Sequence, residues 1–387
     1  MTRYGIMQHY ALGARIRTHY AKEDILGDEY NPHDVYVRAS NRERCFVSAL
    51  AQVGGYYPNG TGSEKILSAS IQTDVHDEDF IFVAFETCPY TIGLLKKVPS
   101  LPEYAKFLEE SKPAFEKASQ LPNAGEINIS NFQQLQFELE CKSGHGGLTE
   151  EEQKVRDLIV ERDLAYLRLK FNVSNAKWER ASVGYTFGEL FYANPSADLE
   201  ESDSLGPASP RGSSWESKKK LRLYVAHETS LFVVLQSLGY PQTTIPAFAS
   251  SIIVELHTSK EGPFLRFFLV KHVGTDASRE LSLDMERFTP TGCKKADCNL
   301  GSFQHFWRNQ TYLPSTLGDY AESACEYVKG YVPTAVSETK GLSGVASFMW
   351  LCVELVGIVF CVAVTIALCR KQHSQKSQYA VLQAVHA

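Results

Sequence analysis

The chain of 387 residues carries 39 lysines and arginines against 45 aspartates and glutamates, which gives a net charge of −6 at pH 7. This balance excludes a polybasic surface, so nucleic acid is not an expected partner. With 44% hydrophobic and 11% aromatic residues, the chain is predicted to fold around a substantial core and is not of the disordered class.

The first twenty residues, MTRYGIMQHYALGARIRTHY, lack the basic start, apolar stretch and cleavage site of a signal peptide. Leu12, Ile16 and Tyr20 recur at helical spacing, which predicts an amphipathic helix within a folded domain. We therefore expect the natural protein to extend upstream of Met1, with its signal peptide in that missing part.

Strands and helices alternate along the rest of the outer part of the chain. Short apolar runs predict strands at 34–38, 78–85 and 221–226, and a hairpin made of 250–257 and 264–272. Helical periodicity predicts helices at 39–55, 103–121, 149–171 and 227–239. Ser40 and Glu43 have the spacing of a capping box at the start of the first of these helices. Strands followed directly by helices indicate an α/β fold with a parallel sheet.

Polar side chains follow two of these strands at the point where each strand ends. Arg38 closes the first run, and His227 and Glu228 come directly after 221–226. Ligands of α/β sheets collect beyond the carboxyl ends of the strands, where helix N-termini attract anions. The pattern thus suggests a phosphate site, although Arg38 could instead be a surface ion-pair partner and His227-Glu228 a helix cap.

A metal site is a weaker interpretation of the sequence. His76 and His145 lie in polar stretches that are typical of solvated loops, so we predict no metal.

Residues 345–368, VASFMWLCVELVGIVFCVAVTIAL, are long and apolar enough to cross a bilayer as one helix, with Glu354 as the one acidic residue. Arg370, Lys371 and Lys376 follow at once and predict that this side is cytoplasmic. The sequence therefore predicts a type I membrane protein. Four N-glycosylation triplets fall on the outer side of the span: Asn59, Asn128, Asn172 and Asn309.

Several motifs resemble those of the histidine acid phosphatase family. YNPHDVYVRASNRERCFVSALAQVGGYYP resembles the family's YxRSTDxxRTxxSAxxxLxGLxP stretch, and YVAHETSLFVVLQSLGY its YxxHDTTLxxLLxALG stretch. FIFVAFETCPY, the opening helix and GCKKADCNLGSFQHF are similar to further family elements, in the same order. The similarity extends from Met1 to about Val332 and is strongest to membrane-bound or lysosomal acid phosphatases.

The resemblance implies a phosphoglycerate mutase-like fold: a mixed, mainly parallel sheet flanked by helices, with a helical insertion. The implied divisions are a core of 1–85 and 221–332, a mostly helical insertion at 86–192, a flexible loop at 193–220, a juxtamembrane linker at 333–344, the span at 345–368 and a cytoplasmic tail at 369–387.

The resemblance also implies hydrolysis of phosphate monoesters through a phosphohistidine, without a cofactor. Arg38 and His227 match phosphate-binding positions, and Glu228 stands where most acid phosphatases have the acidic proton donor Asp. The family's RHGxRxP motif, which supplies the nucleophilic histidine, does not occur in the sequence; Arg3 to Gly5 has Tyr4 where that histidine would be. The first strand and the nucleophile loop are therefore expected to be missing. The competing interpretation is a catalytically silent receptor or phosphoester-binding ectodomain.

The cysteines and the C-terminal tail give two further predictions, disulfide pairings and a sorting signal. The resemblance implies the disulfides Cys88–Cys325 and Cys293–Cys298, and leaves Cys45 and Cys141 as free thiols or partners of each other or of the missing part. Tyr379 and Leu382 form a YxxL pattern that is similar to endosomal–lysosomal sorting signals read by an adaptor. We expect an endosomal–lysosomal or cell-surface protein, and the resemblance allows a homodimer.

Overall fold

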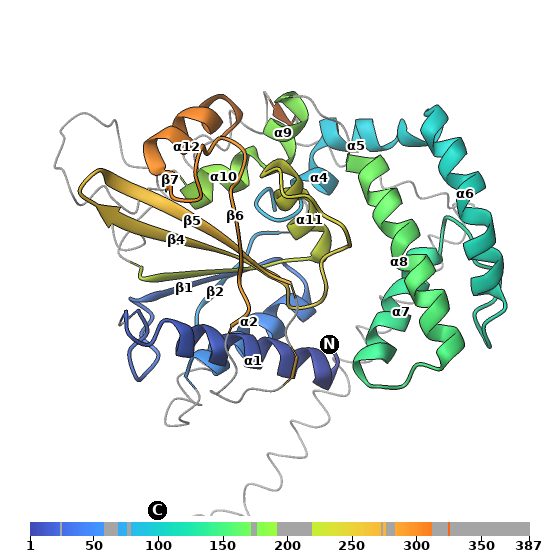
Figure 1. Ribbon diagram of the computed structural model, residues 1–387, viewed down its shortest axis with the longest axis horizontal. Helices are drawn as coiled ribbons and strands as arrows, with labels where there is room; N and C mark the ends of the chain where they lie inside the picture. Colours follow the sequence, from blue (N-terminus) through green and yellow to red (C-terminus); the bar gives the residue numbers. More distant parts are fainter. Residues whose placement is uncertain are drawn as a thin grey trace, which may run out of the picture. The chain divides into compact units, whose positions relative to one another are not determined.

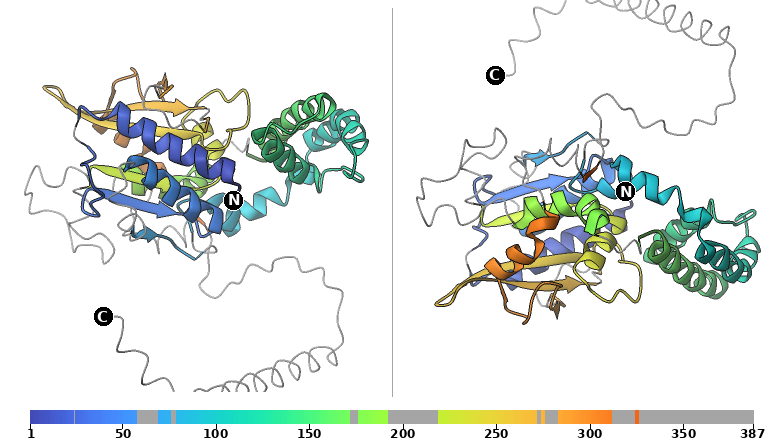
Figure 2. Two further views of the ribbon diagram at one scale, coloured as in Figure 1. Left: turned by 90° about the horizontal axis from the view of Figure 1, so that it is seen from below. Right: turned by 90° about the horizontal axis from the view of Figure 1, so that it is seen from above.

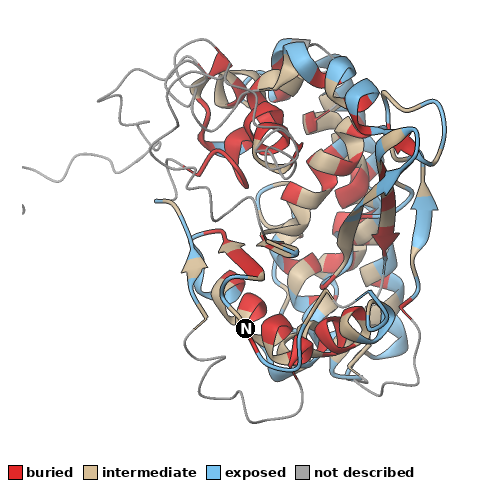
Figure 3. Ribbon diagram, turned by 90° about the vertical axis from the view of Figure 1, so that its left-hand side faces the viewer, coloured by how far each residue is buried: buried red, intermediate tan, exposed pale blue. Residues whose placement is uncertain are grey.

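A three-stranded parallel sheet carries the residues of most interest. β1 (Val35–Ala39) lies in the middle and pairs in parallel with β2 (Ile71–Gln72) and β3 (Leu221–Val225) (Figure 1). Val35, Val37 and Ala39 lie on one face of β1 and are almost fully buried. Figure 3, coloured by burial, shows buried positions in helices as well as strands. The strands predicted at 34–38 and 221–226 are thus confirmed, and so is the parallel α/β class.

The computed structural model describes residues 1–23, 25–57, 69–75, 79–171, 176–191, 219–271, 274–275, 283–311 and 324–325. These residues belong to one compact unit, Met1–Lys329. The predicted loop at 193–220 falls mostly outside this part of the chain, as do the linker, span and tail from 333 onward, with Tyr379 and Leu382. His76, Asn59 and Asn172 lie outside it too.

A second sheet is built on the predicted hairpin. β4 (Ser251–Ser259) and β5 (Gly262–Val270) pair antiparallel, and β6 (Glu286–Phe288) and β7 (Cys298–Asn299) both pair with β5. In the described part of the chain β3 and β4 are both edge strands, since each pairs with only one neighbour.

Helices α1 (Arg3–His19) and α2 (Glu43–Tyr56) share a core with β1 and β3. Their backbones cross at Gly13 and Gly55, so closely that a Cβ on Gly55 would lie 2.1 Å from the carbonyl oxygen of Tyr10. Figure 2 shows α1 in dark blue running alongside both groups of strands. This close crossing fixes α2, and with it the position of the side chains in its first turn.

Gly55→Ala is therefore expected to destabilise the protein by about 1–3 kcal/mol, because backbone must move to admit the methyl group. Gly54→Ala is the matched control, since its Cβ would lie 3.6 Å from the Tyr10 ring, an ordinary contact. The control should be neutral or slightly stabilising through helix propensity. Urea unfolding of both variants checks this, and equal midpoints would contradict the role given to the crossing.

Another aromatic-rich core involves the short helices α4 (Ala84–Thr87), α9 (Ala176–Ser182) and α10 (Gly184–Phe191), together with α11 (Glu228–Ser237) and α12 (Leu300–Trp307). Rings of Phe187 and Trp307 meet edge-to-face with centroids 4.8 Å apart. The 3-10 turn Arg308–Gln310 follows α12.

The strand predicted at 78–85 is wrong. In its described part, from Asp79 onward, the backbone turns and enters α4; the amide of Val83 donates to the carbonyl of Asp79 at 3.1 Å, and that of Phe82 to the Asp79 carboxylate at 3.2 Å. The apolar side chains of this run are all buried, and a fully buried run shows no periodicity that distinguishes a strand from a turn and a helix.

The helices between the two sheet-forming regions group together. α5 (Pro89–Leu95), the 3-10 turn Val98–Ser100, α6 (Pro102–Ser119), α7 (Phe132–Gly144) and α8 (Glu150–Phe171) follow in order. α8 packs against α6 and α7 (Figure 1), around a separate core that includes Phe115, Phe132 and Ile159. The helices predicted at 103–121 and 149–171 are confirmed. The proposed boundaries of an insertion domain stay a prediction.

One carboxyl group of α8 is buried, and its burial lowers the stability of the folded protein at neutral pH. Asp163 is only 3% exposed, and Gln133 donates to it at 2.7 Å. Burial, opposed by that hydrogen bond and by Lys170 and reinforced by Glu228, raises the pKa of Asp163 from 3.8 to about 6. A raised pKa means that the folded state holds the proton more tightly, so this group lowers stability as pH rises from about 4 to 6.

Asp163→Asn should therefore stabilise the protein at pH 7 by about 1–3 kcal/mol and flatten its stability between pH 4 and 6. The amide oxygen can still accept the bond from Gln133. Asp157→Asn, an exposed change on the same helix, is the control. Thermal unfolding of the variants and the unmodified protein between pH 4 and 7 checks this. Equal unfolding temperatures of Asp163→Asn and the unmodified protein at every pH would contradict the cost assigned to Asp163.

Both disulfides implied by the resemblance are present: Cys88–Cys325 and Cys293–Cys298. Cys45 is a buried free thiol and Cys141 an exposed one, so the alternative in which they pair with each other is not what the structure contains. Asn128 and Asn309 are exposed, as glycosylation would require, and remain predicted sites. Among the described residues no helix has the length and apolar character needed to cross a membrane.

Candidate functional site

The carboxyl ends of β1 and β3 lie side by side. The strands pair in register from Val35↔Leu221 to Ala39↔Val225, and the amide of Ser40 extends the ladder by donating to the carbonyl of Val225 at 2.9 Å. The residues that follow each strand, Ser40 on one side and His227 on the other, are thereby brought to the same edge of the sheet.

His227 is the residue that joins these two strand ends. It precedes the first turn of α11 in extended conformation, and its Nε2 lies 3.2 Å from the hydroxyl of Ser40. Its Nδ1 lies 3.0 Å from the guanidinium of Arg44, in the first turn of α2, and 3.9 Å from the sulfur of Cys45. Three residues, one at the end of β1 and two in the first turn of α2, thus surround the imidazole of His227.

The contact between Ser40 and His227 explains why the predicted capping box is wrong. α2 begins at Glu43, its N-cap is Arg42, and no side chain caps it. Ser40 is fully buried and directs its hydroxyl to His227 and to the carboxyl group of Asp79.

Glu228 is the first residue of α11 and is partly buried beside His227. Burial is the main cause that raises the pKa of Glu228, and the nearby Glu86 adds to it, whereas Arg44 and the hydroxyl of Thr229 oppose the rise. A carboxyl group of this kind holds its proton to a higher pH than an exposed one, which is what a proton donor needs.

Arg38 reaches the same sheet edge but is engaged elsewhere. Its guanidinium forms an ion pair with Asp74, which follows β2, and its side chain is 15% exposed. Burial opposes its charge, yet the hydrogen bond to Tyr36 and the carboxylates of Asp74 and Glu189 outweigh this and raise the pKa of Arg38. The three predicted site residues thus lie at one edge of the parallel sheet, where the guanidinium of Arg38 is paired with Asp74.

Three further residues of this site were not predicted as such: Ser40, Arg44 and Asp79. A cation in the first turn of a helix that follows a strand is a signal that could have singled out Arg44. Asp79 directly precedes an apolar run that becomes wholly buried, and the residue itself is 1% exposed. Burial is the main cause that raises the pKa of Asp79, against hydrogen bonds from Phe82 and Ser40 and the charge of Arg38.

A cavity of about 1600 Å³ opens beside this cluster. Arg44, His227 and Glu228 line it, together with one edge each of β3 and β4 and with one face of α1. The backbones of two edge strands thus face the same space.

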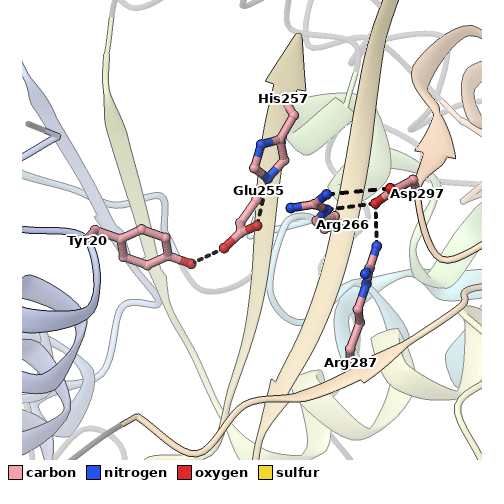
Figure 4. Close-up of polar contacts among 6 residues, drawn as sticks. All are labelled: Tyr20, Glu255, His257, Arg266, Arg287 and Asp297. Carbon is pink, nitrogen blue, oxygen red and sulfur yellow. Dashed lines mark hydrogen bonds and ion pairs between the residues drawn. The ribbon is translucent and has the colours of Figure 1, made fainter. Parts of the chain in front are cut away.

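A second polar group lines the same cavity (Figure 4). The carboxylate of Glu255, on β4, accepts hydrogen bonds from the hydroxyl of Tyr20 and from Nε2 of His257, each at 2.7 Å. Nearby on β5, Arg266 donates to Asp297 at 2.7 Å. The bond from Tyr20 to Glu255 ties the end of α1 to the second sheet. Among the described residues no group of three or more His, Cys, Asp or Glu is arranged to hold a metal ion, and His145 lies exposed at the end of α7.

Residues 1–270 match the model of the histidine phosphatase superfamily, branch 2. The chain belongs to this superfamily. Prostatic acid phosphatase of Mus musculus is 22% identical over 279 residues, which are 69% of this chain and 68% of that protein. Lysophosphatidic acid phosphatase type 6 of Mus musculus is 24% identical, covering 78% of this chain and 66% of that protein. Lysosomal acid phosphatase of Xenopus laevis is 21% identical, covering 68% and 60%.

Solved structures agree on the fold. A phytase from Citrobacter braakii aligns with a TM-score of 0.55 at 14% identity, over 81% of this chain and 89% of that chain. The Hafnia alvei phytase in complex with tartrate gives a TM-score of 0.55, also at 14% identity, over 81% and 88%. The superfamily and its acid phosphatase members support hydrolysis of phosphate monoesters in general, and the identification by motif is confirmed.

Cys45 provides a direct check on the packing of this site. It is 2% exposed, and burial, assisted by Asp79 and Glu228 and opposed by Arg44 and Arg42, raises the pKa of its thiol to about 11. In the folded protein Cys45 should react with iodoacetamide at least about tenfold more slowly than the exposed Cys141. Peptide mass spectrometry measures both rates, and urea should abolish the difference. Rapid labelling of Cys45 in the folded chain would show that the site is open.

Proposed function

We propose that the protein is an acid phosphomonoesterase whose phosphate site lies at the carboxyl ends of β1 and β3. The observation that carries the proposal is the contact of 3.2 Å between Ser40 and His227, since it joins two strand ends that are far apart in sequence. A guanidinium, an imidazole and a carboxyl group with a raised pKa at one sheet edge are suited to a phosphate monoester.

In this proposal His227 and Arg38 hold the phosphate oxygens, and Arg38 exchanges Asp74 for the substrate. A nucleophilic histidine attacks phosphorus, the P–N bond forms, and the P–O bond to the alcohol breaks. The leaving oxygen takes its proton from Glu228. Water then attacks phosphorus, gives a proton back to Glu228 and releases inorganic phosphate and the free histidine.

The nucleophile would come with a further β-strand. Among the described residues the facing edges of β3 and β4 carry no partner, and unpaired N–H and C=O groups along an edge favour addition of a strand. We propose that a strand bearing RHGxRxP, outside the printed sequence, enters this space and places its histidine beside His227. This chain without that strand should not hydrolyse p-nitrophenyl phosphate at acid pH.

The decisive test supplies the strand. Fusing a segment that contains RHGxRxP upstream of Met1 should produce tartrate-sensitive turnover of p-nitrophenyl phosphate at acid pH, and replacing its histidine by alanine should abolish that turnover. Turnover by the chain as printed would contradict the need for the strand. Folded fusions that remain inactive would contradict the proposed activity.

Glu228→Gln, made in the active fusion, should slow the hydrolysis of alkyl phosphates far more than that of p-nitrophenyl phosphate. An alkoxide needs a proton when it leaves, whereas p-nitrophenolate does not, and general acid catalysis contributes typically about 10²–10⁴-fold. Because the pKa of Glu228 is raised, activity on alkyl phosphates should persist as long as Glu228 is neutral and fall as pH rises through that pKa. His227→Ala should lower activity on both substrates. Equal losses on the two substrates in Glu228→Gln would rule out the role of proton donor.

A silent phosphoester-binding ectodomain is the second candidate, because RHGxRxP does not occur in the 387 residues. It predicts that the chain binds inorganic phosphate, with weaker binding in His227→Ala, and that no added strand restores turnover.

We further propose that 345–368 anchors the protein as a type I membrane protein of an endosomal–lysosomal or surface compartment. The apolar run, the disulfides, the exposed triplets at Asn128 and Asn309 and the lysosomal relative support this. Tyr379 and Leu382 would then recruit a sorting adaptor, and the acid phosphatase part could form a homodimer. When the chain is expressed behind a signal peptide, deletion of 345–387 should release it into the medium, whereas the undeleted chain should stay with the membrane.

A further inference from the structure

The contact between Arg44 and His227 fixes where the imidazole carries its proton. A guanidinium has only N–H donors and stays charged, so the 3.0 Å contact requires Nδ1 of His227 to accept. The imidazole must then be neutral, with its proton on Nε2. Contact with Arg44 and protonation of Nδ1 exclude each other.

The opposite side of the ring agrees with this assignment. Nε2 lies 3.2 Å from the hydroxyl of Ser40, which is fully buried and interacts in turn with the buried carboxyl group of Asp79. The proton on Nε2 is donated to the Ser40 oxygen, and the Ser40 hydroxyl proton is directed to Asp79. The bonds run in one direction, from Arg44 through His227 and Ser40 to Asp79.

Arg44 is also free to leave. Its side chain is exposed in the first turn of α2 and lines the cavity, while Ser40 and Asp79 are buried and cannot move outward. Doubly charged phosphate beside a helix N-terminus and a guanidinium is a stronger attraction than a neutral imidazole nitrogen.

We propose that Arg44 positions His227 and becomes a phosphate ligand: as observed, it holds His227 neutral with the proton on Nε2, and a bound phosphate draws the guanidinium away so that Nδ1 takes up a proton and donates to the phosphate. This rests on the phosphate site proposed above. Phosphate binding and proton uptake by His227 are then one event. Among the described residues, other charged or titratable groups around this ring include Cys45 on α2, Glu228 on α11, and Asp79 with Arg38 behind Ser40.

The tautomer is tested by nitrogen NMR of the full chain labelled with ¹⁵N-histidine. His227→Gln assigns the signals, and Ser40→Ala, which perturbs the same ring, assigns them if that variant does not fold. At neutral pH, without phosphate, Nδ1 of His227 should give the signal of an unprotonated nitrogen and Nε2 that of a protonated one. Arg44→Ala should shift population toward a proton on Nδ1, whereas Arg42→Ala, the same loss of charge two residues away, should not. A proton on Nδ1 in the unmodified chain would overturn the inference.

The exchange of partners is tested by calorimetric titration with inorganic phosphate near pH 8, where free phosphate is already doubly charged, in two buffers of different ionisation enthalpy. The unmodified chain should take up protons on binding. Arg44→Ala should bind phosphate about 10- to 100-fold more weakly, which is the loss of one charge-assisted contact, and should take up fewer protons. Arg44→Lys should recover part of the affinity, and Arg42→Ala should bind as the unmodified chain does.

Two outcomes separate this inference from the proposed function. Equal affinities in Arg44→Ala and Arg42→Ala would overturn the role of Arg44 as a ligand while leaving the phosphate site in place. Absence of phosphate binding in the unmodified chain would overturn both the phosphate site and the exchange of partners, and the NMR signals would still decide the role of Arg44 in setting the tautomer.

Discussion

The parallel pairing of β1 with β3 is the constraint on which the site depends. Five residue pairs and the added bond from Ser40 to Val225 bring both strands to an end at the same level. Side chains alternate between the faces of a strand, so a slip of one residue would turn Ser40 away from His227 and Arg38 away from its present face. The positions of the imidazole, the guanidinium and Glu228 therefore follow from one register.

Helices α1 and α2, which pack on the strands, hold this register in place. α1 and α2 meet through glycine at a distance that no side chain would permit, and their shared core includes Val37 and Val225. Because Arg44 belongs to the first turn of α2, the same packing that buries the strands also aims this cation at His227.

The sequence predicted the elements whose signal is local. Strands β1 and β3, the hairpin β4–β5 and the long helices follow from apolar spacing over a few residues. Arg38 follows from its position near the end of a strand, and His227 and Glu228 from theirs just after one. The predicted strand at 78–85 failed because complete burial removes periodicity.

Contacts between distant residues could not be predicted in the same way. Ser40 has the spacing of a helix cap, and only the neighbouring strand end, 187 residues away, gives its hydroxyl a different partner. Arg44 is one of two arginines in a polar stretch; its place in the first turn of a helix marks it as a candidate, but its partner His227 lies 183 residues away and cannot be inferred locally. The disulfide Cys88–Cys325 spans 237 residues and was reached through resemblance, since spacing alone does not determine a pairing.

Three carboxyl groups near the site, Asp79, Asp163 and Glu228, share one physical property. Burial is the main cause that raises the pKa of each. Charging such groups at neutral pH costs folding free energy, so a sequence adapted to neutral surroundings would gain by replacing them with amides. At acid pH the cost disappears, because the groups are neutral, and Glu228 is then also in the state that can donate a proton. The same burial that makes these residues unfavourable at pH 7 thus suits both the stability and the proposed chemistry to an acidic compartment.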